Sequence, residues 1–172
     1  MTENIKTLFT AEEIKSCIKK LSAQIEEDYT GKDFTVILVS NGALIFGCDL
    51  IRDVSIPLHL DTISASSYRG SESTGQVDLR AGLKLCVKKR HVLIVDDILD
   101  TGRTLNFIVE KIQEENPLSL KTCVLLDKPS RRTVDISADY TGFEIEDHFV
   151  IGYGLDYDEH YRNLPYIGVM GE

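Results

Sequence analysis

The segment Val92-Leu-Ile-Val-Asp-Asp-Ile-Leu-Asp-Thr-Gly-Arg-Thr104 decides the fold of this chain. Its first four residues form the most apolar stretch of the sequence, and such a run predicts a central parallel strand that is buried on both faces. Residues 96–104 are expected to form a loop, followed by a helix that ends near Glu115. Strand, loop and helix in this order are typical of an α/β protein.

The same alternation continues on both sides of this segment. Residues 10–27 have apolar positions at helical spacing, with Thr10 as N-cap and Glu13 completing a capping box. A second helix is predicted at residues 43–52, and further strands at residues 34–39, 56–63, 120–126 and 149–154. The pattern predicts an α/β fold with an open, mainly parallel sheet flanked by helices, in one domain that spans residues 1–172.

One segment interrupts this alternation. Residues 64–82 are rich in Ser and Gly and contain few apolar residues, which predicts a long loop. Long loops in compact domains commonly act as lids or binding elements, so we interpret this one as a flexible lid. A hairpin tip without a function remains the alternative.

Composition excludes several classes of function. The chain has 172 residues, 42% of them hydrophobic, which suffices for one core. With 28 acidic and 19 basic residues its net charge is −9, so nucleic acid is not an expected partner. No apolar run is long enough to cross a membrane and no signal peptide is evident, which favours a cytoplasmic protein. Because its four cysteines and four histidines do not cluster, we expect reduced thiols and no zinc site.

Residues 96–104 combine two opposite electrical features. Thr101, Gly102, Arg103 and Thr104 lie at the predicted start of a helix, where free N–H groups and the helix dipole favour a phosphate. Asp96, Asp97 and Asp100 would repel a phosphate unless they address sugar hydroxyls or a metal such as Mg²⁺. A sugar phosphate satisfies both halves, whereas the P-loop of ATP-binding proteins is absent from the sequence. The alternative is that the aspartates only end a strand and cap a turn.

The quoted segment resembles the phosphoribosyl pyrophosphate motif of the type I phosphoribosyltransferases. Three further stretches resemble the hypoxanthine-guanine branch of that family, in family order: Ser67-Tyr68, Leu125-Leu-Asp-Lys-Pro-Ser-Arg-Arg132, and Phe149-Val-Ile-Gly-Tyr-Gly-Leu-Asp-Tyr157 continuing to Tyr161-Arg162. The resemblance implies the type I phosphoribosyltransferase fold, with a small hood formed from the chain ends and a mobile loop. It also implies purine salvage, in which the 5-phosphoribosyl group passes to hypoxanthine or guanine and gives IMP or GMP and pyrophosphate.

The resemblance also implies roles for individual residues. Asp100 would be the catalytic base that takes the N7 proton of the purine, and Lys128 would hold its 6-oxo group. The other implied roles are as follows: Asn41, Gly42, Asp96, Asp97, Asp100, Thr101, Gly102, Arg103, Thr104 and Arg162 for phosphoribosyl pyrophosphate; Phe149, Val150 and Asp156 beside Lys128 for the purine; Ser67 and Tyr68 for the lid; and Asp96, Asp97 and Asp156 for Mg²⁺. A homodimer or homotetramer is implied as well.

One position departs from the family pattern. Where members often have Leu-Lys-Gly after the first strand, this chain has Ser40-Asn41-Gly42, so no lysine side chain is present there for pyrophosphate. By resemblance, the peptide bond between Ser40 and Asn41 is expected to be cis.

Two rival interpretations remain open from the sequence. A regulator on the same fold would sense phosphoribosyl pyrophosphate or nucleotides without catalysis, although the acidic composition disfavours nucleic-acid binding. A signalling receiver domain also begins with an acidic strand end, but the 75 residues from Ile98 to Glu172 are too few for the rest of one.

Overall fold

A six-stranded sheet with five parallel strands forms the centre of the protein. The computed structural model describes residues 5–67 and 77–171. The strand order is β4-β3-β2-β5-β6-β7, and only β4, which pairs with β3, runs antiparallel. The bounds are β2 (Phe34–Ser40), β3 (His59–Ser67), β4 (Val77–Ala81), β5 (His91–Leu99), β6 (Ser119–Asp127) and β7 (Tyr140–Glu144). The predicted open, mainly parallel α/β sheet is confirmed.

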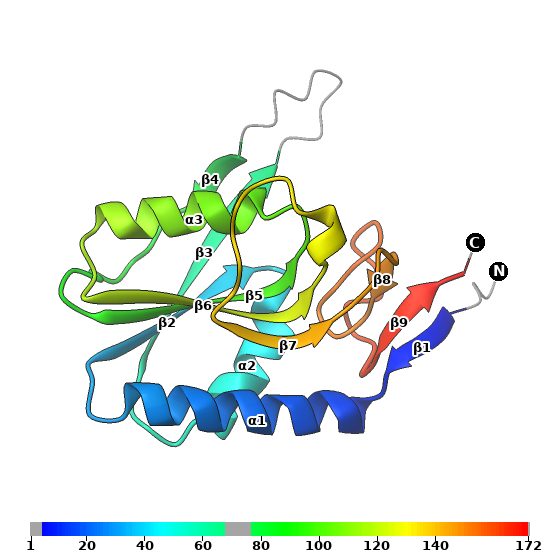
Figure 1. Cartoon of the computed structure of the whole chain (residues 1–172), viewed down its shortest axis with the longest axis horizontal. Coiled ribbons are helices and arrows are strands. Elements are labelled where there is room, and N and C mark those ends of the chain that lie inside the picture. Colours follow the sequence, from blue (N-terminus) through cyan, green and yellow to red (C-terminus); the bar gives the residue numbers. More distant parts are fainter. Residues whose placement is uncertain (1–4, 68–76, 172) are drawn as a thin grey trace.

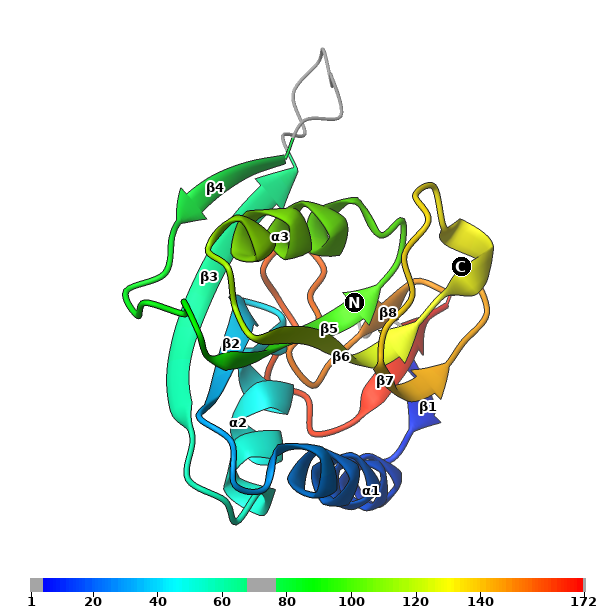
Figure 2. The ribbon, with the colours of Figure 1, turned by 60° about the vertical axis from the view of Figure 1, so that its left-hand side comes forward.

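Helices cover both faces of this sheet (Figures 1 and 2). Helices α1 (Ala11–Tyr29) and α2 (Ala43–Asp53) pack on one face, and α3 (Arg103–Glu114) packs on the other. A hydrophobic core lies on each face of the sheet, and β5 contributes to both. Leu93 and Val95 pack in the core beneath α1 and α2, whereas Val92 and Ile94 pack in the core beneath α3. All four are fully buried, as the continuous apolar run predicts.

Helix α1 begins where its sequence predicts. The Thr10 hydroxyl accepts a hydrogen bond from the Glu13 N–H at 3.3 Å, and the Glu13 carboxylate accepts one from the Thr10 N–H at 2.8 Å. This reciprocal pair is the predicted capping box. None of the helices within residues 5–67 and 77–171 is long and apolar enough to cross a membrane.

The two ends of the chain build a second, smaller sheet. Strands β1 (Ile5–Phe9), β9 (Ile167–Met170) and β8 (Val150–Ile151) pair antiparallel in the order β1-β9-β8. Figure 1 shows this sheet beyond the ends toward which β5, β6 and β7 run. It is the predicted hood. The strand predicted at residues 149–154 is shorter than expected, because residues 152–154 all have positive φ, which extended strands do not allow.

The predicted boundaries around the two loops are wrong in part. Strand β5 continues to Leu99 instead of ending at Val95, because Ile98 and Leu99 still pair with Leu126 and Asp127 of β6. Strand β3 begins at His59, three residues later than predicted, and extends through residues 64–67. Those residues pair with β4, so the range 64–82 is not loop throughout. Backbone pairing along a sheet edge needs no apolar side chains, which explains why the pattern missed it.

A buried carboxylate ties the segment after β4 to β3. Asp61, which is 6% exposed, accepts hydrogen bonds from the N–H groups of Thr62, Lys84 and Leu85 at 2.7 to 2.8 Å. Burial acts to raise the pKa of Asp61, but the three donors outweigh it and the pKa is lowered. A lowered pKa means that this carboxylate stabilises the fold above its unfolded pKa and that the contribution is lost as the pH falls.

We predict that Asp61→Ala lowers the free energy of unfolding by roughly 2–4 kcal/mol, because buried N–H groups lose a charged acceptor. Urea unfolding at neutral pH measures the loss. Asp61→Asn is the control, since one amide oxygen still accepts from two donors, and its loss should be smaller. The difference between wild type and Asp61→Ala should shrink below about pH 4, where the unfolded aspartate is protonated. Equal stability of wild type and Asp61→Ala at pH 7 would contradict this role.

Candidate active site

A cavity of about 410 Å³ opens at the carboxyl ends of β2 and β5, against the start of α3. In parallel α/β sheets this edge is where ligands bind. The cavity is lined by seven of the predicted site residues: Gly42, Asp96, Asp97, Asp100, Thr101, Gly102 and Thr104. The structure therefore brings both predicted halves, the carboxylates and the start of the helix, into one space.

Asp96 and Asp97 form a pair of adjacent carboxylates near the end of β5, with Asp96 buried and Asp97 half-buried. Asp96 accepts from the Asp97 N–H at 3.0 Å, and Asp97 accepts from the Ile98 N–H at 2.8 Å. The pKa of Asp96 is raised well above its ordinary value, first by burial and then by the neighbouring charge of Asp97. Burial also raises the pKa of Asp97, although the charge of Arg162 acts to lower it. Two adjacent acids, one buried and one half-buried, favour a cation or hydroxyl donors as partners.

The turn after β2 lies directly against this pair. A Cβ atom on Gly42 would come within 1.7 Å of the Asp97 Oδ2, so only glycine permits this approach. The peptide bond between Ser40 and Asn41 is cis, as the resemblance implied. Asn41 itself is exposed and does not line the cavity.

Asp100 also lines the cavity and contacts an arginine. The Arg131 Nε donates to the Asp100 Oδ1 at 3.3 Å, and the Arg131 Nη1 lies 3.5 Å from the Asp147 Oδ2. Arg131 is the last residue of the short 3-10 helix Pro129–Arg131, and it lines the cavity. The sequence interpretation did not assign it a role. The signal was two adjacent arginines, Arg131 and Arg132, three and four residues after Lys128.

The N-terminus of α3 has the geometry expected of an anion site. Gly102 has φ +84°, and an added Cβ would lie 2.6 Å from the Ile136 Cγ2, so glycine is required at this turn. The first intrahelical bond runs from the Asn106 N–H to the Gly102 carbonyl at 2.9 Å, which leaves the N–H groups before it without helical partners. The Arg103 side chain instead donates to the Thr133 hydroxyl at 3.2 Å, and Arg103 does not line the cavity.

The residues predicted to contact a base lie on and beside the loop before β8. Lys128 is 7% exposed and donates to the His148 carbonyl at 2.5 Å, with the Asp147 Oδ1 at 4.0 Å. Phe149 directly follows His148 in the chain and is 53% exposed. Its ring packs edge to face against Tyr157, with ring centroids 5.5 Å apart. An exposed aromatic ring beside a buried lysine offers a stacking surface and a hydrogen-bond donor for a flat heterocycle. Val150 begins β8 and is buried.

Asp156 and Arg162 form an ion pair near the hood, with the Arg162 Nη2 at 2.9 Å from the Asp156 Oδ1. Arg162 also donates to the Gly154 carbonyl at 2.7 Å. Neither residue lines the 410 Å³ cavity. Ser67 ends β3, whereas Tyr68, the other predicted lid residue, and the rest of residues 68–76 lie outside the described residues.

The predicted metal ligands do not form a ready-made cage. Within residues 5–67 and 77–171, no three His, Cys, Asp or Glu side chains converge on one point, so Asp96, Asp97 and Asp156 do not meet as a trio. Mg²⁺ commonly binds through one or two protein carboxylates, with waters and substrate oxygens completing its shell. The adjacent carboxylates of Asp96 and Asp97 fit this limited number of protein ligands for Mg²⁺.

The fold and this site define an α/β protein of the class that binds phosphorylated ligands at the carboxyl edge of a parallel sheet. Residues 4–158 match the phosphoribosyl transferase domain family, and the chain belongs to that family. This membership excludes the receiver-domain interpretation.

Curated relatives match over almost the whole chain. The hypoxanthine-guanine phosphoribosyltransferase of Staphylococcus aureus strain Mu50 is 45% identical over 166 residues, which cover 96% of this chain and 93% of that protein. The hypoxanthine-guanine phosphoribosyltransferase of Streptococcus pneumoniae strain R6 is 43% identical over 168 residues, covering 97% and 93%.

Solved structures show the same similarity in three dimensions. A hypoxanthine phosphoribosyltransferase from Staphylococcus aureus superimposes with a TM-score of 0.92 at 45% identity, covering 96% of this chain and 91% of that one. A hypoxanthine-guanine phosphoribosyltransferase from Bacillus anthracis gives a TM-score of 0.92 at 40% identity, covering 99% and 100%.

Proposed function

We propose that this enzyme acts in purine salvage. It transfers the 5-phosphoribosyl group from phosphoribosyl pyrophosphate to hypoxanthine or guanine, releasing pyrophosphate and giving IMP or GMP. The observation that carries the proposal is that one cavity is lined both by the adjacent carboxylates of Asp96 and Asp97 and by the start of α3. Relatives at 43% and 45% identity that are named for this activity support it.

The sugar phosphate is expected to lie along β5 and the turn into α3. The 5′-phosphate accepts hydrogen bonds from the N–H groups of Thr101, Gly102, Arg103 and Thr104, where the helix dipole favours an anion. The ribose hydroxyls donate to Asp96 and Asp97, and this offsets the cost of burying those carboxylates. Pyrophosphate lies toward the backbone of Asn41 and Gly42 and toward Arg162.

The purine is expected to lie between Phe149 and the wall that carries Asp100. Asp100 takes the N7 proton while N9 attacks the ribose C1′, and Lys128 donates to the 6-oxo group. Both groups act on one edge of the base, where N7 and the 6-oxo group are neighbours. Main-chain groups of Val150 and Asp156 meet the other edge of the ring.

Mg²⁺ is the cofactor that the carboxylates suit. When bound, it supplies positive charge to the departing pyrophosphate and to the ribose hydroxyls. Asp96, Asp97 and Asp156 are the residues that would hold it, with substrate oxygens and water completing its coordination. Its requirement is measured by adding EDTA, which should abolish turnover, and excess MgCl₂, which should restore it.

Pyrophosphate release with phosphoribosyl pyrophosphate, Mg²⁺ and each of hypoxanthine, guanine, xanthine, adenine and orotate in turn tests the proposal. Release with hypoxanthine or guanine, and none with adenine or orotate, is expected. Absence of phosphoribosyl pyrophosphate binding by calorimetry in magnesium buffer would refute the whole assignment.

Because the relatives are named as enzymes, we do not propose the non-catalytic regulator as the function of this chain. Assembly into a homodimer or homotetramer is part of the proposal and is measured by sedimentation equilibrium.

We predict that Gly42→Ala weakens phosphoribosyl pyrophosphate binding by roughly tenfold or more. The new methyl group would overlap the Asp97 Oδ2, so the carboxylate or the pyrophosphate turn must move. Calorimetry in magnesium buffer measures the affinity. Gly82→Ala is a control, since Gly82 has no positive φ, its Cβ would meet only the Leu79 Cδ2 at 3.4 Å, and Gly82 lies outside this cavity. Unchanged affinity of Gly42→Ala would remove this turn from the binding site.

A further inference from the structure

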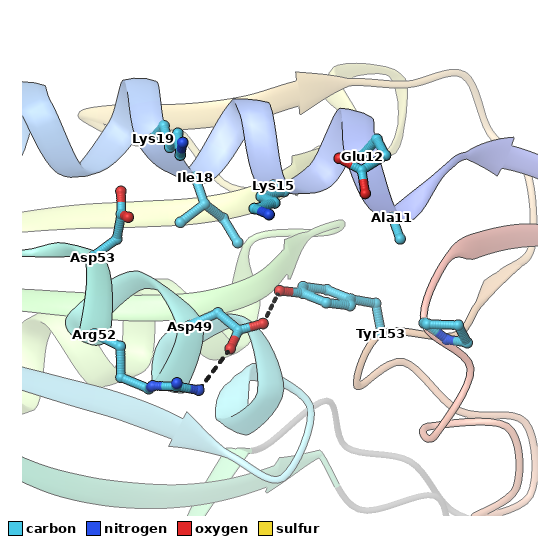
Figure 3. A pocket seen from close by; sticks show the side chains of 10 residues that line it. Ala11, Glu12, Lys15, Ile18, Lys19, Asp49, Arg52, Asp53 and Tyr153 are labelled. Atoms are coloured by element: carbon cyan, nitrogen blue, oxygen red, sulfur yellow. Dashed lines mark hydrogen bonds and ion pairs between the residues drawn. The ribbon is translucent and has the colours of Figure 1, made fainter.

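A buried tyrosine joins the hood to α2. The Tyr153 hydroxyl donates to the Asp49 Oδ2 at 2.6 Å (Figure 3). Tyr153 is 8% exposed, and burial together with the Asp49 carboxylate raises its pKa, so the hydroxyl remains a donor across physiological pH. Asp49 lies at the middle of α2, in the helix that begins directly after Gly42.

The loop that carries Tyr153 is tightly constrained. Gly152, Tyr153 and Gly154 have φ of +93°, +51° and +105°, a conformation that is unfavourable for a tyrosine. The N–H groups of Tyr153 and Gly154 donate to the Leu164 and Arg162 carbonyls at 2.9 and 3.0 Å. These backbone hydrogen bonds hold the loop within the hood, whereas the hydrogen bond of the Tyr153 side chain connects the loop to α2.

A short chain of contacts leads from this loop to the carboxylates of the active site. A Cβ atom on Gly154 would lie 2.2 Å from the Gly42 carbonyl, so the two backbones touch. Gly42 in turn lies against the Asp97 carboxylate. On the other side, Gly154 accepts from Arg162, which pairs with Asp156. Gly154 therefore stands between the turn at Gly42 and the ion pair of the hood.

Packing leaves room for movement on the far side of the loop. A cavity of about 490 Å³ lies between α1, α2 and the hood, and Tyr153 and Asp49 form part of its wall (Figure 3). Lys15, Ile18 and Lys19 of α1 line the same space. Because side chains do not fill this space, α1 does not pack directly on this side of Tyr153, and the hydrogen bond to Asp49 is a specific link between the loop and α2.

We propose that Tyr153 and Asp49 are a positioning pair for the pyrophosphate half of the site. Their hydrogen bond sets the distance between Gly42 on one side and Asp156 with Arg162 on the other. Neither residue touches the substrate. The inference rests on the proposed function, in which those two groups bind the pyrophosphate end of phosphoribosyl pyrophosphate.

Two of the groups assigned to the purine, Lys128 and Val150, are held by other elements, and only the Asp156 main chain is shared with the pyrophosphate half. Val150 pairs with Val169 of β9 within the hood sheet, and the Lys128 N–H donates to the Leu99 carbonyl of β5 at 2.9 Å. Loss of the Tyr153 hydroxyl should therefore act on phosphoribosyl pyrophosphate and leave the purine largely unaffected. This selectivity separates a positioning role from a purely structural one.

Tyr153→Phe is the test, because it removes only the hydroxyl oxygen. We expect the KM for phosphoribosyl pyrophosphate to rise about three- to tenfold, the effect of losing one hydrogen bond's contribution to binding. The KM for hypoxanthine and kcat should change less than about twofold. Asp49→Leu should reproduce the effect, Asp49→Asn should restore most of the affinity because its amide oxygen still accepts, and the double variant of Tyr153→Phe with Asp49→Leu should be no worse than either alone.

The chain offers a matched control in Tyr140→Phe. The Tyr140 hydroxyl also donates to a helix carboxylate, Asp28 of α1, which keeps Lys121 as an ion-pair partner at 2.7 Å. Tyr140 lies outside the active-site cavity. Both Tyr→Phe variants should lose similar thermal stability, but only Tyr153→Phe should lose affinity for phosphoribosyl pyrophosphate.

The outcomes separate this inference from the proposed function. A folded Tyr153→Phe with wild-type KM for phosphoribosyl pyrophosphate overturns the positioning pair, as do equal increases in both KM values. If Tyr153→Phe fails to fold, Asp49→Leu against Asp49→Asn gives the same comparison. Wild-type protein that neither binds phosphoribosyl pyrophosphate nor releases pyrophosphate overturns the proposed function itself.

Discussion

Replacing Asp100 by asparagine is expected to lower turnover with hypoxanthine by about 10²–10⁴-fold, the range typical of losing a general base. The amide cannot take the N7 proton as N9 attacks. Affinity for phosphoribosyl pyrophosphate should be nearly unchanged, because a base acts mainly in the transition state. Steady-state kinetics give the first quantity, and calorimetry in magnesium buffer gives the second.

The geometry makes this a demanding test. Asp100 is paired with Arg131 at 3.3 Å, so an asparagine of the same shape keeps an oxygen for that contact and the cavity wall should persist. Asp33→Asn is a suitable control, since Asp33 pairs with Arg90 and His59 and does not line the cavity. Losses of turnover and of affinity by equal factors would rule out Asp100 as the base.

The second large effect is expected at Lys128. Lys128→Ala should weaken hypoxanthine and guanine binding by roughly 10- to 100-fold, because a buried charged donor to the 6-oxo group is lost. Phosphoribosyl pyrophosphate affinity should be almost intact, since the sugar phosphate is expected along β5 and α3. Discrimination against adenine should fall as well, because its 6-amino group is not met by a cation in the variant. Competition binding with hypoxanthine and with adenine measures the loss of purine affinity and the loss of discrimination.

Lys121→Ala is the matched control for this variant. Lys121 lies on β6, the strand that ends directly before Lys128, and pairs with Asp28 at 2.7 Å, outside the cavity. It should leave purine affinity unchanged while lowering stability slightly. Wild-type purine affinity in Lys128→Ala would remove Lys128 from the base-binding site. A loss of phosphoribosyl pyrophosphate binding of the same size would instead indicate that His148 and Asp147 moved when their partner was removed.

Local sequence patterns predicted the elements whose contacts are local or periodic. The capping box of Thr10 and Glu13 located the start of α1, because its two hydrogen bonds join residues three positions apart. The apolar run at residues 92–95 identified β5, because a strand buried on both faces needs such a run. Those patterns missed β1, β7 and β9, which are short strands stabilised by pairing with distant parts of the chain.

The same limit applies to the site. Residues 96–104 already combine carboxylates with a helix start, so their ligand chemistry was readable from one segment. The contact between Arg131 and Asp100 joins residues 31 positions apart, and that between Tyr153 and Asp49 joins residues 104 apart. No spacing rule along the chain reports such distances. The predicted phosphate contact of Arg103 is through its N–H group and stays a prediction, whereas the Arg103 side chain donates to the Thr133 hydroxyl.

The sequence by itself determined the class of fold and the chemistry of the central loop, because hydrophobic period, capping and charge are properties of neighbouring residues. Tertiary structure alone decided which distant groups meet: Gly42 against Asp97, Gly154 against Gly42, and Tyr153 on Asp49. Those approaches depend on how the sheet, α2 and the hood pack together. Packing sums many weak contacts between residues far apart in the sequence, and this sum brings those groups together.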